Sequence, residues 1–203
     1  MGAEESPKRS GGHVSTVIAD GYDAALGRSV EAVRRLFAAA ACSVALVDDD
    51  GETLLFVASD GAGAEAIVGV SIPVSRGIAG WAAMSGQPIA VRDVQSDARF
   101  ARDVAESTQY VPSSILAAPM MSAEGEVVGV TSVLDASVDE ASDWTLHVLG
   151  TLASHMAMLV GRTDAGTDAR ARQVTGSLDD LGRDVLGVVE AWQSSGSRAP
   201  GTR

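Results

Sequence analysis

The sequence predicts an α+β domain in which helices cover both faces of a single antiparallel sheet. Two pairs of short apolar runs are each joined by a turn that contains glycine and acidic residues, a pattern typical of β-hairpins. Segments with helical periodicity precede the first hairpin and follow the second. The strand expected at 127–134 carries Val128 and Val130 on one face and Val127 and Gly129 on the other. Because both faces are largely apolar, both should be covered, which makes three layers.

The composition fits one packed domain with polar ends. The chain has 203 residues, 46% of them hydrophobic, which is enough for one core. The formal net charge of −12 disfavours nucleic-acid binding, because phosphate would be repelled. No apolar run reaches the roughly 18 residues of a membrane-spanning helix, and no signal-peptide pattern is visible. We therefore expect a cytoplasmic protein that binds neither nucleic acid nor membrane.

The beginning of the domain is expected to be helical. Residues 1–13 are polar and rich in glycine and serine, which predicts a disordered arm. Apolar residues then recur at helical spacing over 14–41, interrupted at Gly21 and Gly27. This pattern predicts one kinked helix or two consecutive helices. The domain that begins with this helix is expected to span 14–162.

The first hairpin is expected to pair strands at 42–47 and 53–58. An Asp-Gly turn at 48–51 joins them, because glycine supplies the positive φ that such turns need. Residues 60–66 are expected to form a loop. The run at 68–74 contains a proline, which sheets tolerate at an edge, so an edge strand is expected there.

A short helix bounded by glycines is expected in the stretch 74–100. The helix should occupy 78–84, and Gly86 can adopt the left-handed conformation that ends a helix. Pro88 then prevents helical continuation. A short apolar strand is expected at 89–91.

The second hairpin is expected to pair strands at 114–121 and 127–134, and a helix follows it at 144–162. Ser142 or Asp143 is suited to cap that helix, since serine and aspartate side chains accept bonds from the first free backbone N–H groups.

The C-terminal part contains one further amphipathic segment. A polar linker is expected at 163–176, a helix at 177–193 and a frayed tail at 194–203. The stripe is too apolar to stay solvated, so the helix should dock on its own domain, on a second subunit or on a partner protein. The stripe consists of Leu178, Leu181, Val185, Val188, Val189 and Trp192.

Several motifs occur in an order that resembles the GAF domain family. They read G-x-x-G-W, S-G-x-P-I and R-D-V-x-x-D-x-R-F within 77–100, then SILAAPM at 114–120 and GEVVGVTSVLD at 125–135. The resemblance covers 30–160 and is to stand-alone domains of the bacterial type. It implies a six-stranded antiparallel sheet in the order 3-2-1-6-5-4 and a sensory or regulatory role without enzyme activity.

The resemblance also indicates which chemistry is missing. GAF domains that reduce free methionine sulfoxide use several cysteines, whereas Cys42 is the only cysteine of this chain. Haem-binding and bilin-binding members carry a histidine or cysteine near the region that corresponds to 107–114, which has neither. The N-K-x-F-D pattern of cyclic-nucleotide binders is absent. His147 and His155 lack the spacing of a shared metal site. We therefore expect no catalytic residue, no metal and no cofactor.

A small-molecule pocket is expected beneath the short glycine-bounded helix, since a cavity can form between such a helix and the sheet. Trp81 could close this cavity or stack on a ring; alternatively, Trp81 and Phe100 could be ordinary core residues. The candidate lining residues are Ile78, Trp81, Val91, Asp93, Phe100, Tyr110, Ile115 and Ala117.

The sequence therefore predicts a non-enzymatic regulatory domain that binds an unidentified small molecule. It should signal through a homodimer or a partner protein. The helices at 29–40 and 144–162 are expected together on one sheet face, where related domains often dimerise. Two alternatives stay open: a small-molecule enzyme on the same scaffold, and a ligand-free adaptor whose pocket its own side chains fill.

Overall fold

The computed structural model describes residues 20–137 and 142–160. The strands are β1 (Ala41–Val47), β2 (Thr53–Gly61), β3 (Ser71–Pro73), β4 (Ile89–Val91), β5 (Ile115–Met121) and β6 (Val127–Leu134). The helices are α2 (Asp20–Leu36), α3 (Ala64–Ile67), α4 (Gly77–Ser85), η1 (Val94–Ser96), α5 (Arg102–Ser107) and α6 (Asp143–Val160).

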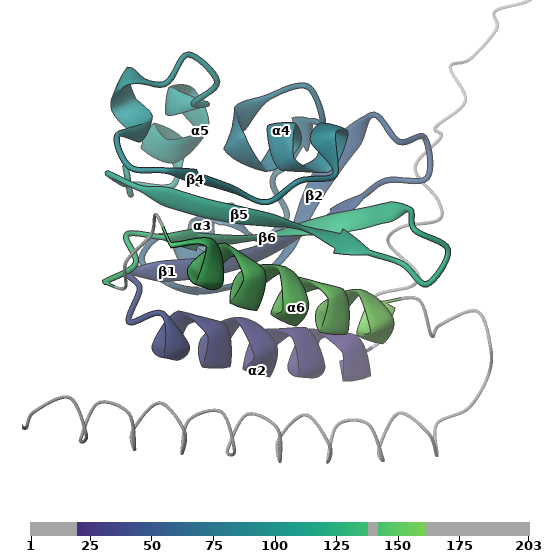
Figure 1. Ribbon diagram of the computed structural model, residues 1–203. Helices are drawn as coiled ribbons and strands as arrows, with labels where there is room; N and C mark the ends of the chain where they lie inside the picture. The colour runs from purple at the N-terminus through teal and green to yellow at the C-terminus, as the bar shows by residue number, and fades with distance from the viewer. Residues whose placement is uncertain (1–19, 138–141, 161–203) are drawn as a thin grey trace, which may run out of the picture. The chain divides into compact units, whose positions relative to one another are not determined.

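The six strands form one antiparallel sheet in the order β3-β2-β1-β6-β5-β4. Helices α2 and α6 lie on one face, and α4 and α5 lie on the other (Figure 1). The predicted strand order and the three layers are confirmed. The segments predicted at the chain ends, at 1–13, 163–176, 177–193 and 194–203, lie outside the described residues.

Helices α2 and α6 lie side by side and share one apolar core with the sheet (Figure 1). The predicted placement of these two helices on one sheet face is confirmed. Helix α2 is continuous through Gly27, so the break considered there does not occur. The buried side chains of this layer include Leu26, Val30, Val33, Phe37, Leu149, Ala153 and Met156.

Helix α6 begins at the residue that follows its cap. The Ser142 hydroxyl accepts a hydrogen bond of 3.1 Å from the backbone N–H of Thr145, which satisfies one of the free N–H groups of the first turn. Of the two candidate caps, Ser142 is therefore the one used, and Asp143 is the first helical residue. Within 20–137 and 142–160, no helix combines the length and apolarity needed to cross a bilayer.

A bulge in β6 changes which faces two of its residues occupy. Met120 pairs with Gly129, whereas Met121 pairs with Val127, so Val128 is an extra residue. Val128 consequently packs into the α2–α6 core, and Val127 packs into the opposite core together with Val130. The predicted faces of Val127 and Val128 were wrong, because strict alternation ends where a bulge inserts a residue.

The second core lies between the sheet and the short helices. Helix α4 ends as predicted, with Gly86 at φ 63° and its N–H bonded to the Ala82 carbonyl. The segment 60–66 is not only loop, because β2 extends to Gly61 and α3 starts at Ala64. The edge strand occupies only Ser71–Pro73, since the chain before it turns at Gly69, where φ is 88°.

Candidate ligand pocket

A cavity of about 110 Å³ lies between the sheet and the segments that cover its second face, and it is partly open to solvent. The sheet contributes Ala41, Ser43, Phe56, Ser59, Ile72, Ile115, Ser132 and Leu134. The covering segments contribute Ala62, Gly63, Ile67, Gly77, Ile78, Ala79, Phe100, Ala101, Val104, Ala105, Thr108, Tyr110 and Pro112.

The walls of the cavity are apolar and partly aromatic. Phe56 comes from the sheet, Phe100 from the segment before α5, and Tyr110 from the segment after it. Among the described residues that line the cavity, none carries a charged side chain. Such a cavity favours a ligand with an apolar body, because hydrophobic side chains line most ligand pockets and a few polar groups fix orientation.

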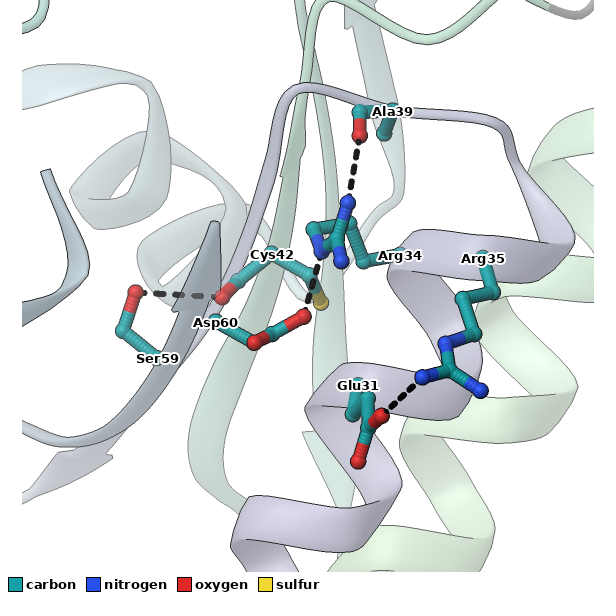
Figure 2. Close-up of polar contacts among 7 residues, drawn as sticks. All are labelled: Glu31, Arg34, Arg35, Ala39, Cys42, Ser59 and Asp60. Carbon is teal, nitrogen blue, oxygen red and sulfur yellow. Dashed lines mark hydrogen bonds and ion pairs between the residues drawn. The ribbon is translucent and has the colours of Figure 1, made fainter. Parts of the chain in front are cut away.

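A row of three serines crosses the floor on neighbouring strands. Ser43 of β1 pairs with Ser59 of β2 and with Ser132 of β6. The Ser59 hydroxyl donates a 3.1 Å hydrogen bond to the Cys42 carbonyl, as Figure 2 shows. Ser43 and Ser132 are each only 6% exposed. Within the described part of the chain, no group forms a hydrogen bond with either of their hydroxyls.

One side of the cavity is fixed by a carboxylate that follows β6. Asp135 has a positive φ of 51°, and its carboxylate accepts bonds of 2.8 Å from the backbone N–H groups of Ser113 and Ser114. It also accepts a hydrogen bond from the hydroxyl of Tyr110. Burial, followed by the hydrogen bond to Asp135, raises the pKa of Tyr110 to about 12.

Two ion pairs lie on the outer side of the covering helices. Arg99 donates to both carboxylate oxygens of Asp97, at 2.9 and 2.6 Å, and lies 5.2 Å from the centre of the Trp81 ring. The hydrogen bond from Arg99 lowers the pKa of Asp97 to about 2. Arg76, which precedes α4, donates to Asp103 of α5 at 2.7 Å. These contacts connect α4 to the segment that includes η1 and α5.

Cys42 lies on the opposite face of the sheet from the cavity. It belongs to the α2–α6 core, and burial, together with nearby Asp60, raises the pKa of its thiol. Arg34 of α2 forms an ion pair with Asp60 and also donates to the Ala39 carbonyl at 3.5 Å (Figure 2). The only thiol of the chain is thus separated from the cavity by the sheet. Within the described ranges, no group of three or more His, Cys, Asp or Glu side chains could hold a metal ion.

Half of the predicted pocket residues line the cavity. Ile78, Phe100, Tyr110 and Ile115 do so. Whether they contact a ligand stays a prediction.

The other four predicted residues lie elsewhere. Val91 and Ala117 are buried in the second core. Asp93 is exposed and accepts a 2.7 Å hydrogen bond from the Ser96 hydroxyl at η1. Trp81 is half-buried beside Arg99 and is not part of the lining.

The prediction also missed the polar floor. Ser43 interrupts an otherwise apolar run in β1, and this interruption was the sequence signal that could have drawn attention to it. Ser132 gives no comparable signal, because only the pairing of β1 with β6 places it beside Ser43.

Comparisons with known proteins agree with this architecture. The GAF domain model matches residues 22–160. Dual 3′,5′-cyclic-AMP and -GMP phosphodiesterase 11A of Takifugu rubripes is 31% identical over 68 residues, which are 34% of this chain and 8% of that protein. The chain therefore matches only a small part of the length of this curated relative.

Two solved structures share the fold. The GAF domain of a phosphoenolpyruvate-protein phosphotransferase from Coxiella burnetii has a TM-score of 0.64 and 20% identity, over 74% of this chain and 89% of that one. Free methionine-R-sulfoxide reductase from Neisseria meningitidis has a TM-score of 0.58 and 20% identity, over 79% and 86%. The family model matches most of the length of the chain, and the sheet has the strand order expected of that family. The chain therefore belongs to the GAF domain family.

Proposed function

We propose that this domain binds a small molecule in the cavity under α4 and α5 and passes the binding event on to a second subunit or a partner protein. GAF domains are a family of small-molecule sensing and regulatory domains. The observation that carries the proposal is the cavity itself: about 110 Å³ of space, with aromatic walls and with serine hydroxyls on its floor. A ligand-free adaptor would be expected to fill this space with its own side chains.

The residues around the cavity favour binding over catalysis. Acid–base catalysis needs a titratable group within reach of the substrate. Tyr110 is the titratable side chain in the described lining, and its hydroxyl is engaged by Asp135. Thiol chemistry of the kind that reduces methionine sulfoxide would need cysteines at the cavity, but Cys42 lies behind the sheet. The likeness to the Neisseria reductase is one of fold.

Strands β5 and β6 offer a route from the cavity to the other layer. Ser132 and Ile115 line the cavity, whereas their chain neighbours Val133 and Leu116 are buried in the core with α6. A ligand that moves one face of these strands therefore also moves residues beneath α6.

The surface of α6 supports a homodimer as the means of output. Trp144 is 65% exposed and Met158 is 57% exposed, and they lie about four helical turns apart on the same stripe. In a dimer, these two side chains would give a second copy of α6 apolar contacts at both ends of the helix. We include the helix predicted at 177–193 as a second candidate for partner docking.

A variant that fills the cavity tests the proposal. Ala105 of α5 lines the cavity, so a phenyl group in Ala105→Phe should occupy the space that a ligand needs. We expect some members of a metabolite panel to raise the melting temperature of the wild-type protein and to lose this effect with the variant. Ala66→Phe, on an exposed position of α3, serves as the matched control and should behave like the wild type. Should Ala105→Phe fail to fold, Ser132→Leu fills the cavity from the sheet side.

Two results would count against the proposal. If metabolites raise the melting temperature of Ala105→Phe as much as that of the wild type, they bind outside the cavity. No stabilisation of the wild type by any compound would favour the ligand-free adaptor. Chemical turnover of a stabilising compound would favour the enzyme.

A further inference from the structure

The floor of the cavity presents two serine hydroxyls to which no residue of 20–137 or 142–160 forms a hydrogen bond. Ser43 and Ser132 are each 6% exposed as residues, and both line the cavity. They are directly paired across β1 and β6, which places their Cβ atoms about 5 Å apart. Neither hydroxyl is among the fully enclosed, unpartnered side-chain atoms of the described residues, so both open to the cavity, where a polar group of a guest can reach them.

Ser59, the third serine of the row, differs because its hydroxyl has a hydrogen-bond partner within the protein. Ser59 also lines the cavity, but its hydroxyl donates to the Cys42 carbonyl (Figure 2). Ser43 and Ser132 have no such bond within the part of the chain that the structure describes. Their hydroxyls are therefore available to a guest in the cavity, and each can both donate and accept.

The charge distribution argues against an anionic guest. The described lining holds no arginine, lysine or histidine. Arg76 and Arg99, which border the covering helices, are paired with Asp103 and Asp97. Burying a phosphate in this cavity would remove its hydration without supplying a cation, which is strongly unfavourable.

The size and walls of the cavity define the apolar part of the guest. A dry apolar cavity of about 150 Å³ in another protein accommodates benzene, so this cavity is on the scale of one ring. Phe56, Phe100 and Tyr110 provide aromatic walls for such a ring.

We propose that the cavity takes a neutral, ring-bearing compound whose hydroxyl or carbonyl group hydrogen-bonds to Ser43 and Ser132, and that it does not take a cyclic nucleotide. This inference rests on the proposed function, because it names the chemical class of the ligand for the same cavity. It separates this domain from the phosphodiesterase whose name refers to cyclic AMP and GMP.

The inference is tested with three probes on the full chain: phenol, toluene and cyclic GMP. Dissociation constants come from NMR titrations that follow residues of the cavity. The wild-type protein should bind phenol more tightly than toluene, and cyclic GMP should bind more weakly than either. The double variant Ser43→Ala/Ser132→Ala should weaken phenol binding by roughly 3- to 10-fold, the worth of about one net hydrogen bond, and leave toluene binding unchanged.

Two controls keep the test interpretable. Ser59→Ala should leave the dissociation constants of phenol and toluene unchanged, because the Ser59 hydroxyl is already hydrogen-bonded to the Cys42 carbonyl. The double variant should melt no lower than the wild type, since it removes two hydroxyls that are not hydrogen-bonded to any residue the structure describes. If it does not fold, Ser132→Ala alone should show the loss in phenol binding.

Three outcomes overturn the inference. If the double variant binds phenol with the same dissociation constant as the wild type, the two serine hydroxyls do not hydrogen-bond to the guest. Cyclic GMP binding more tightly than phenol removes the preference for a neutral guest, while leaving the sensory role intact. A failure of all three probes to shift cavity resonances excludes a ring-sized guest. The sensory role itself fails separately, when no metabolite distinguishes the wild type from Ala105→Phe.

Discussion

Replacing Asp135 with alanine is expected to lower the free energy of unfolding by about 3 kcal/mol, because three close donors, and the Ser114 hydroxyl at 3.5 Å, lose a charged acceptor. The carboxylate accepts the backbone N–H groups of Ser113 and Ser114 and the hydroxyl of Tyr110. Alanine also tolerates the positive φ of this position poorly. Urea denaturation monitored by circular dichroism measures the loss.

Asparagine at the same position provides the control. Asp135→Asn keeps an acceptor oxygen and tolerates a positive φ, so its cost should be clearly smaller than that of alanine. Equal stability losses for the two variants would show that these hydrogen bonds contribute little. Ligand binding should weaken with Asp135→Ala, because the Tyr110 wall of the cavity loses its support.

The same group of residues gives the domain a sensitivity to alkaline pH. The folded-state pKa of Tyr110 is raised from 10.0 to about 12, so the folded state holds this proton more tightly than the unfolded state. The associated stability is complete below pH 10 and is lost as the pH rises towards 12. Wild-type protein should therefore lose its stability advantage over Tyr110→Phe across this interval. A constant difference between the two proteins would contradict the assignment.

Substitution by alanine should destabilise the domain at one helical glycine and stabilise it at another. A Cβ on Gly80 of α4 would lie 2.3 Å from the Val74 carbonyl oxygen, which is backbone and cannot move without displacing the segment before α4. Gly80→Ala should therefore cost about 1–3 kcal/mol, as overpacking of a core does, and should weaken ligand binding because α4 covers the cavity. Gly150→Ala in α6 meets nothing within 4 Å and should stabilise the domain by about 1 kcal/mol.

Thermal melting of both variants distinguishes these effects. If Gly80→Ala melts at or above the wild-type temperature, the close approach of α4 to Val74 is not present in solution. If Gly150→Ala destabilises the domain, its position on α6 must be in a contact, for which a dimer interface is the first candidate.

The order of the elements could be predicted because each depends on local pattern. Helix α4 shows this most clearly, since Gly86 and Pro88 mark its end in the sequence and Gly86 adopts the expected left-handed conformation. The bulge at Val128 could not be predicted, because it depends on pairing with β5 rather than on the residues of β6 alone. Helix α3 was missed since four residues are too few to show helical periodicity.

The pocket could be predicted in location but only partly in composition. Ile78 lines the cavity, whereas Trp81, which was included because an aromatic ring there could stack on a ligand or close the cavity, does not. In the structure Trp81 lies to the side of the cavity, beside Arg99. The serine floor depends on the register of β1 against β6, which joins residues far apart in the sequence and leaves no local trace.

The most direct test of the central claim is native mass spectrometry of the full chain after incubation with a small-molecule extract of the cells it comes from. The wild-type protein and Ala66→Phe should each retain a non-covalently bound compound, and that compound should be uncharged. Ala105→Phe should carry the mass of the polypeptide alone, because its phenyl group occupies the cavity. Retention of the same compound by Ala105→Phe at the wild-type level would contradict the account.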